Sequence, residues 1–181
     1  MSEIILENQN DLLLKKLLKF YNEDNLKKML SIINGETNIS LRIIDWFTTN
    51  YAKKKNTKYE TKSNKRFFVY DDYKLKLKAF KKQRFDPFCR WSRIRIPYGK
   101  TSSIETTIGQ LNFFKWALEN DLLVYIKENY SLIETDMNTN NSFSRSKKQY
   151  LKNTRKKREE LSASGSKCIN REDTEISIKF K

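Results

Sequence analysis

The segment between Tyr70 and Lys100 constrains the fold most, because two parts of it place apolar and basic residues at alternate positions. In residues 73–79, YKLKLKA, three lysines would occupy one face of a strand and the apolar side chains the other. In residues 91–96, WSRIRI, the arginines share a face with Trp91, opposite the isoleucines. Successive side chains of a β-strand point to opposite faces. The pattern therefore predicts two strands, each with a buried apolar row and a basic row.

Two further segments are predicted to join these strands in a small antiparallel sheet. Residues 66–70, RFFVY, are aromatic and β-branched, which favours a strand. Residues 174–180 alternate apolar and polar side chains and are expected to form a terminal strand. The Asp71-Asp72 pair is interpreted as a short hairpin turn. Residues 100–107, KTSSIETT, are expected to be a loop.

Helical periodicity dominates the N-terminal part of the chain. Residues 10–21 carry leucines at helical spacing, and Asn10 is a suitable cap. A second helix is predicted from residue 24 to the Asn-Gly pair at 34–35, and a third begins at Ser40. The polar, basic residues 53–66 lack an apolar period and are predicted to form an exposed loop.

The longest apolar region, residues 104–137, predicts two helices separated near Asn120. The first has apolar side chains on a second side as well, so it is either buried centrally or presents a face to a partner. The polar residues 138–146 are interpreted as a linker. These elements together predict an α+β fold, in which a small antiparallel sheet packs on helices. The expected sections are an N-terminal helical section (1–52), an α+β core (53–140), and a basic arm with a terminal strand (141–181).

Positive charge is sorted along the chain, which has a net charge of +15. Residues 53–100 contain 17 bases and 4 acids, and residues 145–181 contain 12 bases and 5 acids. Residues 1–52 and 101–144 are slightly acidic. Such segregation creates a field that attracts polyanions. No helix-turn-helix or zinc-finger motif is visible, which favours contacts to the phosphate backbone over base reading.

The residue inventory excludes several kinds of chemistry. The chain contains no histidine, which excludes Ser-His and Cys-His catalysis and two-histidine metal sites. Two cysteines cannot form a four-cysteine zinc site or a disulfide framework, and they suit a reducing compartment. We expect no cofactor, no metal site, no signal peptide and no membrane span.

The candidate binding residues fall into two basic groups. The main predicted surface consists of Lys74, Lys76, Lys78, Lys81, Lys82, Arg84, Arg90, Arg93 and Arg95. The second predicted clamp consists of Lys147, Lys148, Arg155, Lys156, Lys157 and Arg158. Two other interpretations of the second group are a nuclear import signal and a run of charged side chains that only contacts solvent.

Three pieces of the sequence resemble a protein of nucleocytoplasmic large DNA viruses, which include the giant viruses of amoebae. They are FFVYDDYKLKLKAFKKQRFDPFCRWSRIRIP, IETTIGQLNFFKWALENDLLVYI and TRKKREELSASGSK, and the resemblance covers roughly residues 40–181. The resemblance implies a protein of the virion or of the viral factory in the host cytoplasm. For a small basic member it suggests a genome-condensing, non-histone chromatin protein.

The expected function is non-enzymatic binding and condensation of double-stranded DNA, largely without sequence preference. RNA is a possible ligand, and a homodimer is a possible state. One alternative is a viral transcription or replication factor that reads sequence. Another is a metal-dependent nuclease that uses Asp71 and Asp72, since paired carboxylates beside a lysine can bind Mg²⁺. A third is a virion scaffold protein whose charge contacts acidic partners.

Overall fold

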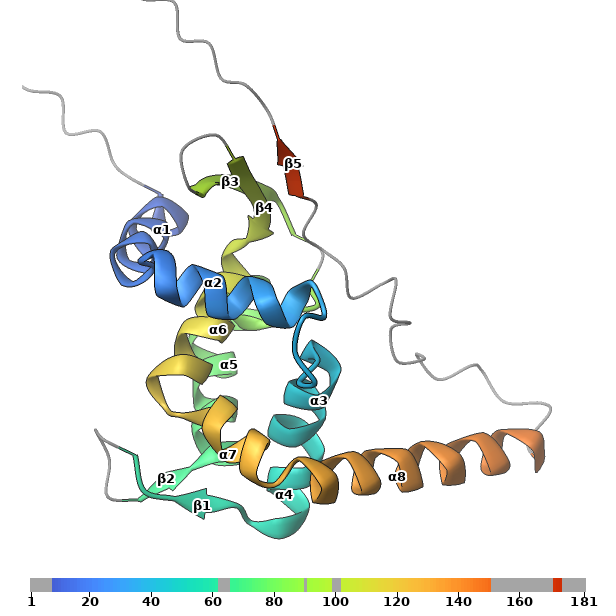
Figure 1. The fold of residues 1–181 in the computed structure, drawn as a ribbon. Coiled ribbons are helices and arrows are strands. Elements are labelled where there is room, and N and C mark those ends of the chain that lie inside the picture. Colours follow the sequence, from blue (N-terminus) through green and yellow to red (C-terminus); the bar gives the residue numbers. More distant parts are fainter. Residues whose placement is uncertain (1–7, 62–65, 90, 99–101, 151–170, 174–181) are drawn as a thin grey trace, which may run out of the picture.

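The computed structural model describes residues 8–61, 66–89, 91–98, 102–150 and 171–173. It confirms the predicted α+β class: helices form most of the body, and two small antiparallel sheets lie at opposite ends of it (Figure 1). In the part of the chain that is described, no helix is both long and apolar enough to cross a lipid bilayer.

The described N-terminal residues form helices, as their apolar spacing predicts. Their elements are α1 (Gln9–Phe20), α2 (Glu23–Ile33), α3 (Leu41–Trp46), the π-helix η1 (Phe47–Tyr51) and α4 (Ala52–Lys55). Ser40 caps α3 as expected, since its side chain accepts a hydrogen bond from the backbone N–H of Ile43 at 3.3 Å. The cap of α1 is Asn8, not the predicted Asn10. The predicted loop 53–66 is also partly wrong, because α4 runs to Lys55 and a short strand follows it.

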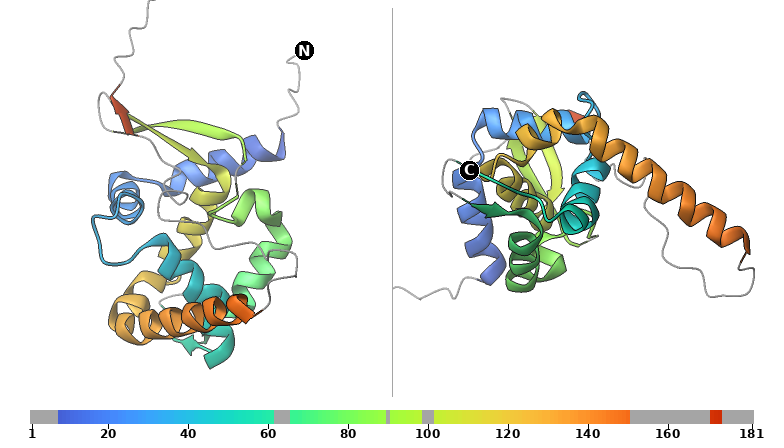
Figure 2. Two further views of the ribbon diagram at one scale, coloured as in Figure 1. Left: turned by 90° about the vertical axis from the view of Figure 1, so that its right-hand side faces the viewer. Right: turned by 90° about the horizontal axis from the view of Figure 1, so that it is seen from below.

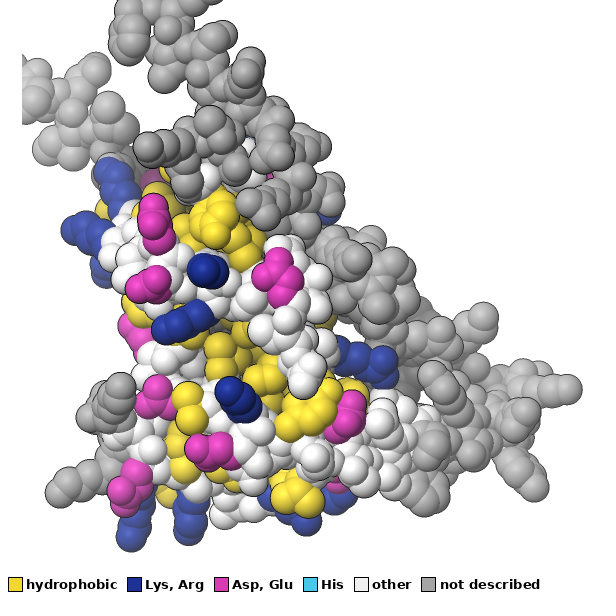
Figure 3. Space-filling view, viewed as in Figure 1, with side chains coloured by type: hydrophobic (Ala, Val, Ile, Leu, Met, Phe, Trp, Pro, Cys, Tyr) yellow, Lys and Arg dark blue, Asp and Glu magenta, His cyan; other side chains and the backbone are white. Residues whose placement is uncertain are grey.

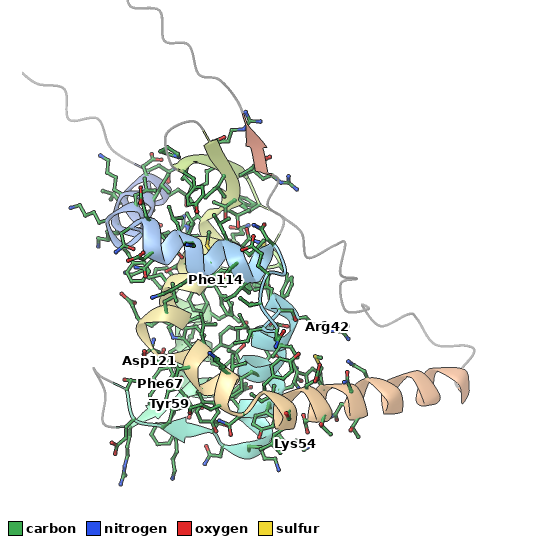
Figure 4. All side chains as sticks on the ribbon, viewed as in Figure 1. Arg42, Lys54, Tyr59, Phe67, Phe114 and Asp121 are labelled. Carbon is green, nitrogen blue, oxygen red and sulfur yellow. The ribbon has the colours of Figure 1, made fainter. Side chains whose placement is uncertain are left out.

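The first sheet pairs β1 (Lys58–Tyr59) with β2 (Phe67–Phe68). Tyr59 attaches this sheet to the helices, since its ring stacks on Tyr125 with centroids 4.7 Å apart and meets the edge of Phe67 at 5.5 Å. Its hydroxyl donates to the carbonyl of Asn120 at 2.8 Å. Figure 4 labels Tyr59 and Phe67 at this end of the molecule.

The strand predicted at 66–70 is confirmed only as the two residues of β2, because α5 (Val69–Phe85) begins directly after it, and the strand predicted at 73–79 is wrong, because α5 occupies those residues. Val69, Tyr73 and Phe80 lie at helical spacing and pack inward, the first two fully buried. Leu75, which the strand pattern would bury, is 65% exposed. Lysine is a poor strand residue and a good helix former, so the Lys-Leu alternation is compatible with a helix once Tyr73 has a core to enter.

Lys81 interrupts α5 with a backbone conformation that side chains rarely adopt, at φ 62° and ψ 163°. The chain after it is held firmly against α6 (Ile108–Glu119). The side-chain amide of Asn112 donates to the carbonyl of Arg84 at 2.9 Å. Gly109 permits this approach, because a Cβ there would lie 2.9 Å from the carbonyl oxygen of Asp86. The packing of α5 on α6 therefore maintains the strained residue.

Replacing Lys81 by glycine should raise the free energy of unfolding by about 1 kcal/mol, because glycine adopts this conformation without a Cβ clash. Lys82→Gly is the matched control, since it removes the same charge from the adjacent, helical residue and should destabilise by about 1 kcal/mol. Urea unfolding measures both changes. Equal destabilisation by the two variants would contradict the assignment of strain to Lys81.

Helix α6 lies at the centre of the core. Of the two predicted alternatives for this helix, central burial is therefore confirmed, and a face presented to a partner is not. Leu111, Phe113 and Phe114 are fully buried, and at 3.6 residues per turn Leu111 and Phe113 project from nearly opposite sides of the helix. A single hydrophobic cluster includes buried side chains of this helix, and its members range in sequence from Leu17 in α1 to Met137. The hydroxyl of Tyr21 donates to the carbonyl of Leu111, which ties the α1–α2 junction to α6.

The second sheet is built on the hairpin of β3 (Arg93–Tyr98) and β4 (Ser102–Thr107), which β5 (Arg171–Asp173) extends. The strand predicted at 91–96 is confirmed as β3, but the loop predicted at 100–107 is wrong. Ile104 in β4 lies opposite Ile96, and both are buried, so hydrophobic pairing stabilises a strand whose sequence is rich in serine and threonine. The strand predicted at 174–180 lies outside the described residues.

The C-terminal helices of the body are α7 (Leu122–Glu128) and α8 (Tyr130–Tyr150). Ile133 and Met137 are buried, so the first part of α8 packs against the core. The predicted linker at 138–146 is wrong, because the helix continues through it. From there α8 extends beyond the packed helices, as the right-hand view of Figure 2 shows.

Candidate nucleic-acid interface

The predicted basic residues are distributed over three elements and do not form one row on a strand. Six are on α5: Lys74, Lys76, Lys78, Lys81, Lys82 and Arg84. Arg93 and Arg95 are on β3, and Lys147 and Lys148 belong to α8, where the backbone alone is described. Arg90 and residues 155–158 lie outside the described residues.

On α5 the lysines divide between two sides. Lys74 and Lys78 are one turn apart and exposed, so they share a face. Lys76 lies between them in sequence and projects from a different side, because residues two apart on a helix do not face each other. The left-hand view of Figure 2 shows α5 at the outside of the molecule. The helix therefore presents its basic side chains over a wider arc than a strand would.

The strongest convergence of charge joins α5 to α4, and it involves residues outside the predicted set. The ammonium nitrogens of Lys53 and Lys74 lie 5.6 Å and 5.7 Å from the centroid of the Tyr70 ring. Cation–π attraction holds both charges beside one half-buried ring. We name five exposed lysines of α4, β1 and α5 the α4–α5 basic surface; Lys53 and Lys74 meet at Tyr70, and Lys55 lies on the side of α4 toward α8. The five are Lys53, Lys55, Lys58, Lys74 and Lys78. The run of lysines at 53–55 was the sequence signal for this surface.

Figure 3 shows basic side chains at the lower end of the molecule, over β1, β2 and α4, and a second group at the upper left, over α1. The rest of that face mixes acidic, basic and apolar side chains. The positive charge of residues 53–100 is therefore concentrated in part at one end of the body.

Three of the predicted arginines are engaged within the protein. The Arg84 guanidinium donates from Nε to Asn10 at 2.7 Å and from Nη1 to Gln9 at 3.0 Å, so it attaches α5 to α1. Arg93 forms an ion pair with Glu105 at 3.5 Å, and Arg95, which is exposed, also has an interaction within the protein. Arg84 keeps its full charge because its partners are neutral amides, but its side chain is half-buried.

Asp136 anchors α8 to the N-terminal helices. Its carboxylate accepts a hydrogen bond from Lys54 Nζ at 2.5 Å and another from Trp46 Nε1 at 3.1 Å. Figure 4 labels Lys54 where α4 meets α8. Burial by itself would raise the pKa of Asp136, but the hydrogen bonds from Lys54 and Trp46 and the charges of Lys54 and Lys55 outweigh it and lower this pKa. Lys54 is therefore partly neutralised and is left out of the α4–α5 basic surface.

Because folding lowers the pKa of Asp136, its contribution to stability is present above the ordinary aspartate pKa of about 3.9 and is lost as pH falls through the folded value. Asp136→Asn should reduce the free energy of unfolding by about 1–2 kcal/mol at neutral pH. It should also flatten the loss of stability between about pH 5 and pH 2. Urea unfolding at several pH values measures both effects.

The control for this prediction is Glu134→Gln on the same helix, which keeps the oxygen that accepts from Tyr130. It removes one negative charge without touching Lys54. An unchanged pH profile in the Asp136 variant would show that the carboxylate does not stabilise the fold.

The acidic pair considered for metal chemistry does not form a hairpin turn. Asp71 and Asp72 lie in the first turn of α5, where negative charge favours the helix dipole. The Asp72 carboxylate accepts a hydrogen bond from Trp116 Nε1 at 2.5 Å, so it has a structural partner in the core. Among the described residues, no group of three histidine, cysteine or acidic side chains could hold a metal ion.

Comparison with known proteins places the chain among viral relatives. Over 147 residues it is 42% identical to "Uncharacterized protein L507" of Acanthamoeba polyphaga mimivirus. The match covers 76% of this chain and 57% of that protein, so the chain spans little more than half the length of its relative. The resemblance to a giant-virus protein is confirmed to this extent. No solved structure matches the fold. Residues 3–180 match the sequence profile of a family of unknown function, DUF7197, and the chain therefore belongs to that family.

Proposed function

We propose that the protein binds double-stranded DNA without enzymatic chemistry and largely without sequence preference, and so helps to condense a viral genome. The observation that carries this proposal is the convergence of Lys53 and Lys74, from two different helices, on the ring of Tyr70. It concentrates charge from residues 53–100, which have a large excess of bases over acids. DNA phosphates are the polyanion that such a surface fits in a virus with a DNA genome.

The lysines are suited to backbone contacts more than to base reading. Their ammonium groups act as point charges on flexible stems, and they attract phosphates whatever the base sequence. Lys55 of this surface also lines a groove of about 460 Å³ between α4 and α8, in which Lys54 is paired with Asp136. Binding is therefore expected to weaken steeply with salt and to vary little between DNA sequences.

Condensation requires contact with more than one DNA segment. The second predicted clamp begins with Lys147 and Lys148 in the projecting part of α8. At 1.5 Å of rise per residue, Lys147 lies roughly 16 Å along the helix from the anchor at Asp136. This separation supports contact with a second duplex, while the α4–α5 basic surface holds the first. The viral relative supports a viral protein, and the virion or the viral factory is the place that this function implies.

The test is fluorescence anisotropy with short labelled duplexes of unrelated sequence, across salt concentrations from about 50 to 200 mM. We expect similar affinities for all duplexes and a strong decrease in affinity with salt. No binding at the lowest salt concentration would overturn the proposal and favour a scaffold role. One strongly preferred duplex would favour a sequence-reading factor. Mg²⁺-dependent cleavage that Asp71→Ala abolishes would favour a nuclease.

A further inference from the structure

The β3–β4 hairpin carries two exposed arginines, and an exposed tryptophan lies in the segment that enters β3, whereas the ring of the α4–α5 basic surface, Tyr70, is half-buried. Ile96 pairs with Ile104 and Ile94 with Thr106, and these pairs point toward the body. The other positions therefore point outward. They include Arg93 and Arg95, both exposed, with Trp91 two positions before Arg93.

Trp91 differs from the two other tryptophans of the chain. The indole N–H groups of Trp46 and Trp116 each donate to an aspartate, and Trp116 is buried. Trp91 is 43% exposed, and among the described residues no side chain accepts from its indole and no ring stacks on it. An exposed indole two residues from an exposed arginine is available to an aromatic ligand that carries negative charge.

We propose that Trp91, Arg93 and Arg95 form a site for single-stranded DNA, in which the indole stacks on an unpaired base and the arginines bind the flanking phosphates. The ligand is single-stranded because the base faces of a duplex are already stacked and closed to an indole. Guanidinium groups pair with phosphates bidentately, so two arginines suffice to direct a short strand across the face. This inference takes DNA as the ligand from the proposed function, but it concerns a different surface.

Glu105 is the opposing charge at this site. It lies opposite Arg95 in the strand register and 3.5 Å from Arg93 Nη1. The side chain of Arg93 remains 49% exposed, so this single contact leaves donors on the guanidinium for a phosphate. Glu105 therefore keeps Arg93 on the outer face and moderates its affinity for phosphate.

Native tryptophan fluorescence tests the proposal directly. Oligo-dT should quench the emission of the full-length protein, and Trp91→Phe should remove most of the quenching, since Trp116 is buried and Trp46 is half-buried with its indole hydrogen-bonded to Asp136. Trp91→Ala should weaken oligo-dT binding about tenfold and leave duplex binding unchanged. Val124→Ala is the matched control, because it removes another exposed apolar side chain, 54% exposed, from α7. Circular dichroism melting verifies that each variant is folded.

The outcomes separate this inference from the proposed function. Binding of oligo-dT that depends on Trp91, without duplex binding, would support the site and overturn duplex condensation. Duplex binding together with undiminished oligo-dT binding by Trp91→Ala would overturn the site alone. Equal losses for duplex and single strand would also overturn it, and so would tighter binding of oligo-U than of oligo-dT.

Discussion

Replacing Phe85 by alanine is expected to lower the free energy of unfolding by about 3–5 kcal/mol, the largest effect of a single substitution that we predict for this chain. Phe85 is fully buried. Its ring centroid lies 5.7 Å from that of Trp116 and 5.9 Å from those of Tyr73 and Phe113. The change leaves a cavity at the contact between α5 and α6, and close packing on both sides prevents the cavity from closing.

Phe68→Ala is the control for Phe85→Ala, because Phe68 belongs to the same segment of chain but is 38% exposed in β2. It should cost about 1 kcal/mol or less. Urea unfolding compares the two. If Phe85→Ala does not fold, Phe85→Leu gives a smaller, measurable loss of about 1–1.5 kcal/mol. Similar losses from Phe85→Ala and Phe68→Ala would contradict the assignment of Phe85 to the core.

The largest expected effect on binding comes from removing four lysines of the α4–α5 basic surface together. Lys53, Lys55, Lys74 and Lys78 are all exposed, so alanine at these positions should leave the fold intact. Each phosphate contact contributes about 0.9 to the slope of log affinity against log salt concentration. Four lost contacts should reduce that slope by about 3 to 4, and lower duplex affinity about 10³-fold at about 0.1 M salt.

The loss of four positive charges would by itself reduce the affinity for DNA, so the control must remove the same number of charges from another part of the protein. Lys16, Lys19, Lys27 and Lys28 are exposed on α1 and α2 and serve this purpose. Their replacement by alanine should change affinity far less and keep most of the salt slope. Equal losses from the two quadruple variants would mean that the protein attracts DNA through its overall charge, without a defined surface.

The sequence by itself was sufficient for the elements whose signals are local. Ser40 caps α3 as predicted, through a hydrogen bond from a backbone N–H group within the first turn, and such a contact depends on neighbouring residues alone. The apolar positions of α6 on two sides left central burial and a partner face as the two alternatives, and the structure shows central burial. The segregation of charge into residues 53–100 was also visible directly.

Tertiary structure decided what the local pattern left ambiguous. The alternation of lysine and leucine in residues 73–79 fits a strand, yet the same residues place Tyr73 and Leu77 one turn apart on a helix. The aromatic packing of Tyr73 and Phe85 against α6 favours the helix, and this contact links residues far apart in sequence. In the same way, β4 forms because Ile104 meets Ile96.

The composition of the basic surface also depended on the fold. Lys53 and Lys74 are 21 positions apart and meet because α4 and α5 pack around Tyr70. Lys54 is next to Lys53 in sequence, but its ammonium group forms an ion pair with Asp136. Charge is a property of composition, which the sequence determines. Which charges converge and which are neutralised depends on long-range contacts, and the tertiary structure alone determines these.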